Sequence, residues 1–157
     1  MTESTIKDYQ NRIISANKEQ LLIITYELFV EQVNKSIEVL NYNNKEEFDK
    51  YIVKAQKFHR ELMNNLDMSY EISSDLLALY IYMNKKLIQS ALTYDVEPLE
   101  EVIKVANILL EGFRKASVGE NSEVLIKNAQ KLYAGLTYGK GTLNETIISD
   151  ESRGFKA

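Results

Sequence analysis

His59 is the only histidine in this chain of 157 residues, which makes it the first residue to consider as a reactive group. An exposed imidazole on a helix of a four-helix bundle can accept a phosphoryl group, provided that small neighbours let a receiver domain approach. Here the pattern places His59 in the apolar seam of a helix beside Phe58, while Arg60 and Glu61 take the solvent side. The pattern favours a structural histidine in the core and keeps a histidine phosphotransfer domain as the alternative.

Carboxylates are abundant, so a di-iron site inside a helical bundle is the second kind of chemistry to consider. Such a site needs inward-facing Glu residues from two helices and a Glu-x-x-His motif from each of two others. One histidine cannot supply two such motifs, and the pairs Glu46/Glu47 and Glu100/Glu101 fall on predicted outer faces. The sequence also has no cysteine, no glycine-rich phosphate loop and no nucleophile that can be placed beside a base. We therefore expect no enzyme activity, no metal and no cofactor.

The charge balance narrows the range of partners. The 19 basic residues are interleaved with 23 acidic ones, so no cationic stripe is available to neutralise a phosphate backbone. The start, MTESTIKDYQ, has neither the basic nor the apolar region of a secretion signal. No run reaches the ~18 apolar residues of a membrane span. We expect a cytoplasmic protein that binds no nucleic acid and does not insert into a membrane.

Four long apolar stripes, with steps of three and four residues, predict four helices between residues 17 and 118. The first helix begins at Asn17, where Gln20 completes a capping box, and the fourth has the only proline, Pro98, in its first turn. The predicted helices span residues 17–40, 45–67, 70–94 and 98–118. Because the connections are short, successive helices must run antiparallel, as in an up-down four-helix bundle.

Two further segments flank the predicted bundle domain. Residues 1–16 form a leader that carries three large apolar side chains among polar ones, without a regular period: Tyr9, Ile13 and Ile14. The extension, residues 119–157, contains a short amphipathic helix at about residues 122–136 and then an irregular tail. The predicted fold class is therefore all-α, with a short extra C-terminal helix beside the bundle.

The third predicted helix carries more apolar surface than one seam can bury. In its segment LLALYIYM, at residues 76–83, three side chains are expected to point outward from the seam: Leu77, Tyr80 and Tyr82. Either a wide core contact or the extra C-terminal helix covers this second side, or it forms a groove that accepts the apolar face of a client helix.

An ordered set of short motifs between residues 6 and 117 resembles the flagellar secretion chaperone FliS family. The motifs are Tyr9-Gln10, Glu19-Gln20-Leu21-Leu22, Thr25-Tyr26, Lys54-Ala55-Gln56, Glu61-Leu62, Leu66-Asp67, Leu79-Tyr80, Tyr82-Met83, Leu87, Leu99-Glu100-Glu101-Val102 and Phe113-Arg114. Each motif is short, but the set in this order and spacing is typical of the family. Leu28 stands where the family usually has a glycine, and the extension after Gly119 goes beyond the family's usual end.

The resemblance implies a chaperone that binds the C-terminal segment of flagellin, prevents its premature polymerisation and delivers it to the flagellar export apparatus. We expect the client-binding groove to contain four residues: Tyr26, Leu77, Tyr80 and Tyr82. The family's N-terminal segment can cover an apolar pocket until client displaces it, which implies a lid made by Tyr9, Ile13 and Ile14. We further expect a monomer or weak homodimer. A helical adaptor with another client remains an alternative.

Overall fold

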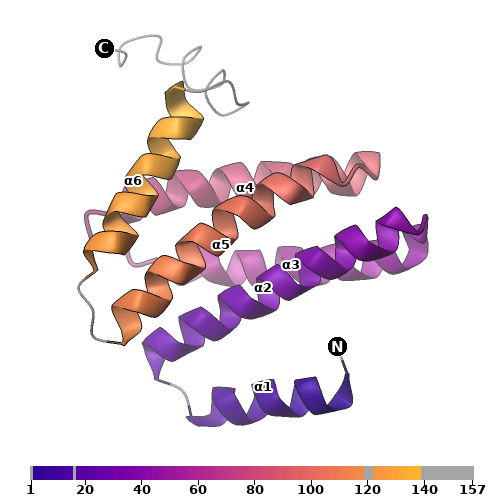
Figure 1. The fold of residues 1–157 in the computed structure, drawn as a ribbon, viewed down its shortest axis with the longest axis horizontal. Helices are drawn as coiled ribbons and strands as arrows, with labels where there is room; N and C mark the ends of the chain where they lie inside the picture. Colours follow the sequence, from indigo (N-terminus) through magenta and orange to yellow (C-terminus); the bar gives the residue numbers. More distant parts are fainter. Residues whose placement is uncertain (1, 16, 119–121, 139–157) are drawn as a thin grey trace.

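The computed structural model describes residues 2–15, 17–118 and 122–138, and all regular secondary structure in this part of the chain is α-helical. The helices are α1 (Glu3–Ser15), α2 (Lys18–Asn41), α3 (Lys45–Asn64), α4 (Ser73–Thr93), α5 (Glu97–Ser117) and α6 (Glu123–Tyr138). The predicted all-α fold is confirmed, and α6 is the predicted extra helix (Figure 1). Of the irregular tail expected from residue 137 onward, the first two residues belong to α6, and residues 139–157 lie outside the described residues.

Helices α2 to α5 lie side by side, and each reverses the direction of the one before it (Figure 1). Helix α2 packs against α3 and α5, and α4 packs against the same two helices. Residues 65–72 make one of these reversals, and the short connections at residues 42–44 and 94–96 make the other two. At the last of these turns the Tyr94 ring packs 5.4 Å from that of Phe48 between centroids, and its hydroxyl donates to Asp49 at 3.0 Å. These contacts fix the end of α4 against the start of α3.

The helix starts follow the predicted local signals in two places and depart from them in a third. The capping box of α2 is confirmed, with Asn17 accepting from the Gln20 N–H at 2.8 Å and Gln20 accepting from the Asn17 N–H at 2.9 Å. Pro98 lies in the first turn of α5, as expected. Helix α4 begins later than expected because Asp67 accepts a hydrogen bond from the Ser69 N–H at 2.9 Å, which makes a turn.

The N-terminal leader, whose apolar residues were given no regular period, contains a helix that was not predicted, because residues 3–15 form α1. Thr2 starts the helix by accepting a hydrogen bond from the Thr5 N–H at 3.1 Å. The large apolar residues Ile6, Tyr9 and Ile13 follow at steps of three and four, which places them on one helical face. Helix α1 packs against α2 on the outside of the molecule (Figure 1).

The core lies between α2, α3, α4 and α5, and α6 closes part of it with Leu125 and Ala129. The largest fully buried side chains include three aromatic residues and the lone histidine: Tyr26, Phe29, Tyr80 and His59. None of the described helices combines the length and the hydropathy that a membrane crossing requires.

Candidate functional site

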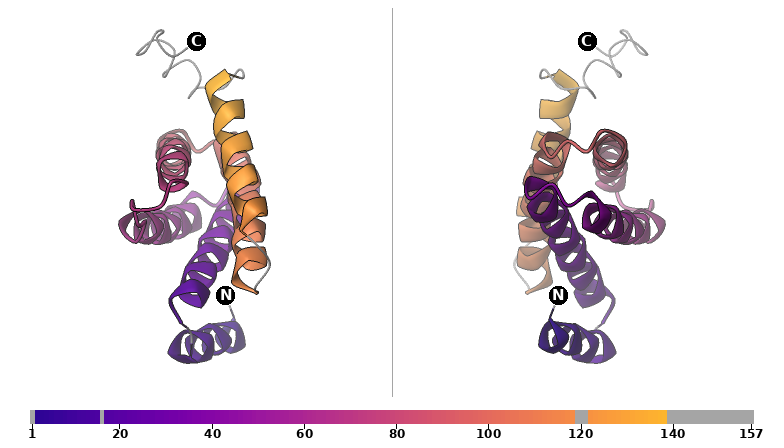
Figure 2. Two further views of the ribbon diagram at one scale, coloured as in Figure 1. Left: turned by 90° about the vertical axis from the view of Figure 1, so that its left-hand side faces the viewer. Right: turned by 90° about the vertical axis from the view of Figure 1, so that its right-hand side faces the viewer.

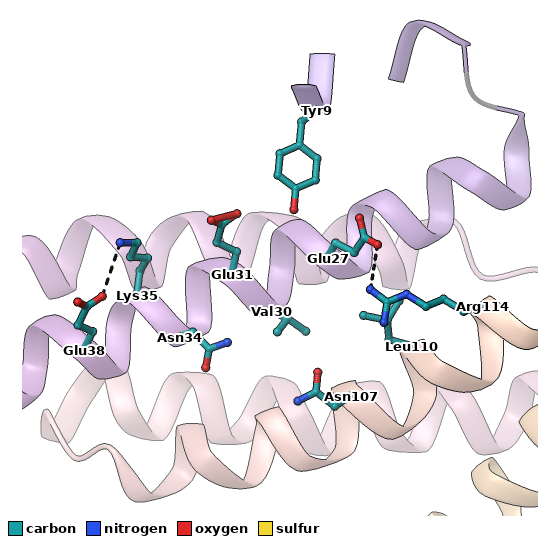
Figure 3. A pocket seen from close by; sticks show the side chains of 10 residues that line it. All are labelled: Tyr9, Glu27, Val30, Glu31, Asn34, Lys35, Glu38, Asn107, Leu110 and Arg114. Carbon is teal, nitrogen blue, oxygen red and sulfur yellow. Dashed lines mark hydrogen bonds and ion pairs between the residues drawn. The ribbon is translucent and has the colours of Figure 1, made fainter. Parts of the chain in front are cut away.

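A groove of about 540 Å³ lies between α1, α2 and α5, and we call it the α1 groove. It is lined by Tyr9 from α1, by Glu27, Val30, Glu31, Asn34, Lys35 and Glu38 from α2, and by Asn107, Leu110 and Arg114 from α5. Figure 3 shows Tyr9 reaching from α1 toward α2 across this groove. Val30 and Leu110 provide the aliphatic part of the lining, whereas its other α2 and α5 residues are polar or charged. The α1 groove therefore suits an amphipathic segment.

Glu27 connects the three helices around the α1 groove. One carboxylate oxygen lies 2.7 Å from Arg12 Nη1 of α1, and the other accepts from Arg114 Nη2 of α5 at 2.9 Å. The Glu27 side chain is only 16% exposed, whereas the two arginine side chains are far more open. Burial by itself raises the pKa of Glu27, but the hydrogen bonds and charges of Arg12 and Arg114 outweigh burial and lower it. Glu27 is therefore ionised at neutral pH and holds α1 by charge.

Helix α1 buries little of its apolar face against the bundle. Tyr9 is half-buried, and the Arg12 guanidinium lies 5.5 Å from the centroid of its ring. Ile6 and Ile13 are each 42% exposed. The expected lid contact is thus made by Tyr9 and Arg12, while Ile13 stays open to solvent and the Ile14 side chain lies outside the described part of the chain. Whether α1 acts as a lid stays a prediction.

The expectation that Tyr80 and Tyr82 point outward is wrong, because both side chains are buried. Tyr80 lies four residues after Leu76 and three before Met83, so all three share the face that meets the core. The Tyr80 hydroxyl lies 2.7 Å from the hydroxyl of Tyr26, which is also fully buried. Burial, with the contact between them, raises the pKa of Tyr26 well above its usual value. Burial raises that of Tyr80 to about 12, although the Tyr26 hydrogen bond opposes it. The two neutral phenols satisfy each other inside the core.

Tyr82 belongs to a polar contact between α4 and α5. Its hydroxyl donates to Glu101 Oε1 at 2.5 Å, and the Nζ of Lys86 lies 3.1 Å from the same oxygen. Burial acts to raise the pKa of Glu101, but the Tyr82 and Lys86 hydrogen bonds outweigh it and lower the pKa. Glu101, expected to be a solvated charge on an outer face, therefore joins two helices.

The outward apolar side of α4 lies elsewhere than expected. The partly buried Leu77 is followed at steps of four and seven residues by Ile81 and Ile88, and Leu92 comes four residues later. Ile81 and Ile88 are 42% and 43% exposed, and Leu92 is more open still. We call these four residues the α4 stripe. Apart from Leu77, the sequence did not predict this stripe, because the prediction was based on the tyrosines of α4 rather than on the spacing of its aliphatic residues.

His59 is enclosed between aromatic rings. Its ring centroid lies 5.7 Å from that of Phe29 and 5.9 Å from that of Tyr80, and its exposed fraction is 0%. Burial lowers the pKa of His59 to about 4 and outweighs the opposing contact with the Tyr80 backbone. The expected structural role is confirmed by this burial, and a receiver domain has no access to the imidazole. Among the described residues, no group of three or more His, Cys, Asp or Glu side chains is placed to hold a metal ion.

A packed helical core, an outer helix joined to α2 by an ion pair beside a groove, and an open apolar stripe together describe an all-α protein that leaves part of its apolar surface open. The family model described as "Flagellar protein FliS" matches residues 1–120. The flagellar secretion chaperone FliS of Bacillus subtilis (strain 168) is 23% identical over 114 residues, which are 73% of this chain and 86% of that relative. The chain belongs to the FliS family. FliS is a family of chaperones, not enzymes, so the resemblance and the expectation of a non-enzyme are confirmed, and the phosphotransfer alternative is not favoured.

Proposed function

We propose that this protein is a cytoplasmic chaperone that binds the C-terminal segment of flagellin, prevents its premature polymerisation and delivers it to the flagellar export apparatus. Membership of the FliS family over residues 1–120 supports this function. The structural observation that carries it is an amphipathic helix, α1, seated at a groove while Ile6 and Ile13 of its apolar face stay open. In this proposal α2 to α5 are the client-binding four-helix bundle, and α1 is its lid.

The lid is weakly held, which is what displacement by a client requires. Its ion pair joins Arg12 and Glu27 at the surface, and such pairs contribute about 0–1 kcal/mol each. Tyr9 adds only a half-buried ring. A client helix that covers more apolar surface than α1 does offsets both contacts, after its own cost of ordering is subtracted.

We propose that the client also contacts the α4 stripe, in place of the buried Tyr80 and Tyr82. Ile88 is 43% exposed, so a client gains somewhat under half of the about 1.5–3 kcal/mol that full burial of an isoleucine gives. Glutamate at this position also brings the cost of burying a charge, so Ile88→Glu weakens client binding about tenfold. Gln89→Glu adds the same charge to the neighbouring exposed position and leaves the affinity nearly unchanged. Helicity measured by circular dichroism stays the same in both variants. Equal affinities for the two variants would remove the α4 stripe from the client site.

The function is tested by calorimetric titration with a peptide of about 40 residues from the C-terminus of the flagellin encoded in the same genome. The full chain and a chain without residues 1–15, the segment that ends with α1, are compared. We expect saturable binding with a strongly negative heat-capacity change, because apolar surface is buried, and tighter binding without α1. No binding to either form contradicts the proposed client and favours an adaptor with another one.

A further inference from the structure

Helix α6 lies beyond residues 1–120, which the FliS family model matches, yet it packs against α4 and α5. Figure 2 shows α6 running alongside α5 in both views. Of its described side chains, Leu125 and Ala129 are buried, whereas α2 buries nine. Leu132 and Leu136 are only partly buried. The contact of α6 with α4 and α5 is therefore apolar, and it buries few side chains completely.

The position of α6 depends on one glycine of α5. A Cβ atom at Gly112 would lie 3.0 Å from Leu125 Cα and 3.1 Å from Leu125 Cδ1. Such a contact is tighter than nearly all real Cβ contacts, so a side chain at position 112 would require α6 to shift by a few tenths of an ångström. The surface of α5 around Gly112 is thus shaped for the close approach of a helix.

Next to this contact the two helices separate. A second groove of about 510 Å³, which we call the α6 groove, is lined by Asn107, Ile108 and Glu111 of α5 and by Asn128, Lys131 and Leu132 of α6. Ile108 and Ile126 on these helices remain partly open to solvent. Helix α6 therefore covers the apolar face of α5 incompletely.

We infer that the face of α4 and α5 around Gly112 is a second helix-binding site, which α6 occupies in cis and from which a helix of the client displaces it. This inference rests on the proposed function, because flagellin is the client. The site takes an amphipathic helix with a large and a small apolar residue four positions apart, the spacing of Leu125 and Ala129. Helix α6 then acts as an intramolecular competitor that lowers the apparent affinity for client.

The test uses two alanine substitutions in the full chain. Gly112→Ala brings a Cβ against the Leu125 backbone, whereas Gly135→Ala on α6 meets nothing within 4 Å and serves as the matched control. Hydrogen exchange of the α6 amides becomes at least about tenfold faster in Gly112→Ala and does not accelerate in Gly135→Ala. Protection of α2 to α5 stays unchanged. Client affinity is not expected to rise in Gly112→Ala, because the added Cβ narrows the same face of α5 for a client helix.

A second variant keeps the test decisive where Gly112→Ala distorts α5. Ala129→Glu places a charge in the buried contact from the α6 side and leaves the α5 face intact, so the same faster exchange of α6 is expected. In this variant client affinity rises about tenfold if α6 occupies its site in about nine molecules of ten. Loss of protection in α2 to α5 together with α6 would make α6 an integral part of the core and overturn the inference. Faster exchange of α6 in Ala129→Glu without any gain in client affinity would also overturn it.

A synthetic peptide of residues 122–138 separates this inference from the proposed function. The peptide is expected to bind the Ala129→Glu chain, whose face is free, about tenfold more tightly than the wild-type chain, whose face α6 occupies in about nine molecules of ten. This result supports a displaceable helix even if no form of the protein binds flagellin. Absence of flagellin binding would contradict only the proposed client. Failure of the peptide to bind the Ala129→Glu chain overturns the second helix-binding site while leaving a measured flagellin affinity intact.

Discussion

At the scale of single residues, two tyrosines in the core depend on each other for a hydrogen-bond partner. Tyr26 and Tyr80 bury their rings, and their hydroxyls meet at 2.7 Å. A buried hydroxyl without a partner costs far more than an absent one, because its desolvation is not compensated. The pair therefore behaves as one unit.

The first prediction concerns this pair. Tyr80→Phe leaves the Tyr26 hydroxyl buried without its partner and lowers the free energy of unfolding by about 1–3 kcal/mol. Replacing both tyrosines with phenylalanine is nearly neutral, because two apolar rings of the same shape replace them. Urea unfolding of the single and double variants measures this, with the exposed Tyr42→Phe as control. If the double variant loses the sum of the single losses, the two hydroxyls do not act together.

The second prediction concerns His59. Its pKa is about 4 in the folded protein against 6.5 for a free histidine, so the unfolded chain binds more protons between these values. The contribution of neutral His59 to the free energy of unfolding is therefore complete above pH 6.5, and roughly 3 kcal/mol of it is lost as the pH falls to 4. In His59→Gln this part of the pH dependence disappears, as urea unfolding at a series of pH values measures. Parallel curves for the two proteins over that range would show that His59 does not titrate on unfolding.

At the scale of helices, those with complete local signals were predicted well. Asn17 and Gln20 define the start of α2, and Pro98 defines the first turn of α5, because capping and proline geometry act within a few residues. Helix α1 was missed because Ile6 was left out of the pattern. With Ile6 included, the steps to Tyr9 and Ile13 are three and four.

The faces of α4 could not be predicted from its sequence alone. Its buried arc includes Tyr80 and Tyr82 as well as Leu79, because α3, α5 and α6 all pack against this helix. The width of the buried arc depends on the number of helices that pack against a helix. The apolar periodicity of the helix itself does not give this number. The ion pairs of Glu27 could not be predicted from the sequence either, since Arg12 and Arg114 lie far from Glu27 along the chain.

The third prediction tests what holds α1. Glu27→Gln removes the charge that attracts Arg12 and Arg114, so the amides of residues 3–15 exchange up to about fivefold faster. Client affinity rises by a similar factor, because the lid opens more often. Glu38→Gln is the control, since the partner of Glu38 is Lys35 on the same helix. Equal exchange of α1 in both variants would mean that the Tyr9 contact alone holds the lid.

At the scale of the whole molecule, α5 separates the two covers. Its residue Asn107 lines both the α1 groove and the α6 groove, while Leu110 and Arg114 belong only to the first and Ile108 and Glu111 only to the second. The two covers therefore flank one helix, with α1 on the side of α2 and α6 on the other (Figure 1). If α1 and α6 are displaced by client as proposed, a long client segment that crosses α5 has to displace both.

The last prediction follows from this arrangement and combines Glu27→Gln with Ala129→Glu. Changes at separate sites that share no contact add in free energy, within about 0.5 kcal/mol, so the factors by which each variant tightens client binding multiply. Calorimetric titration of wild type, both single variants and the double variant with the same flagellin peptide measures the product. A double variant that binds no more tightly than the better single variant contradicts it. In that case the client occupies one flank of α5 only, because opening the second flank would then add no binding surface.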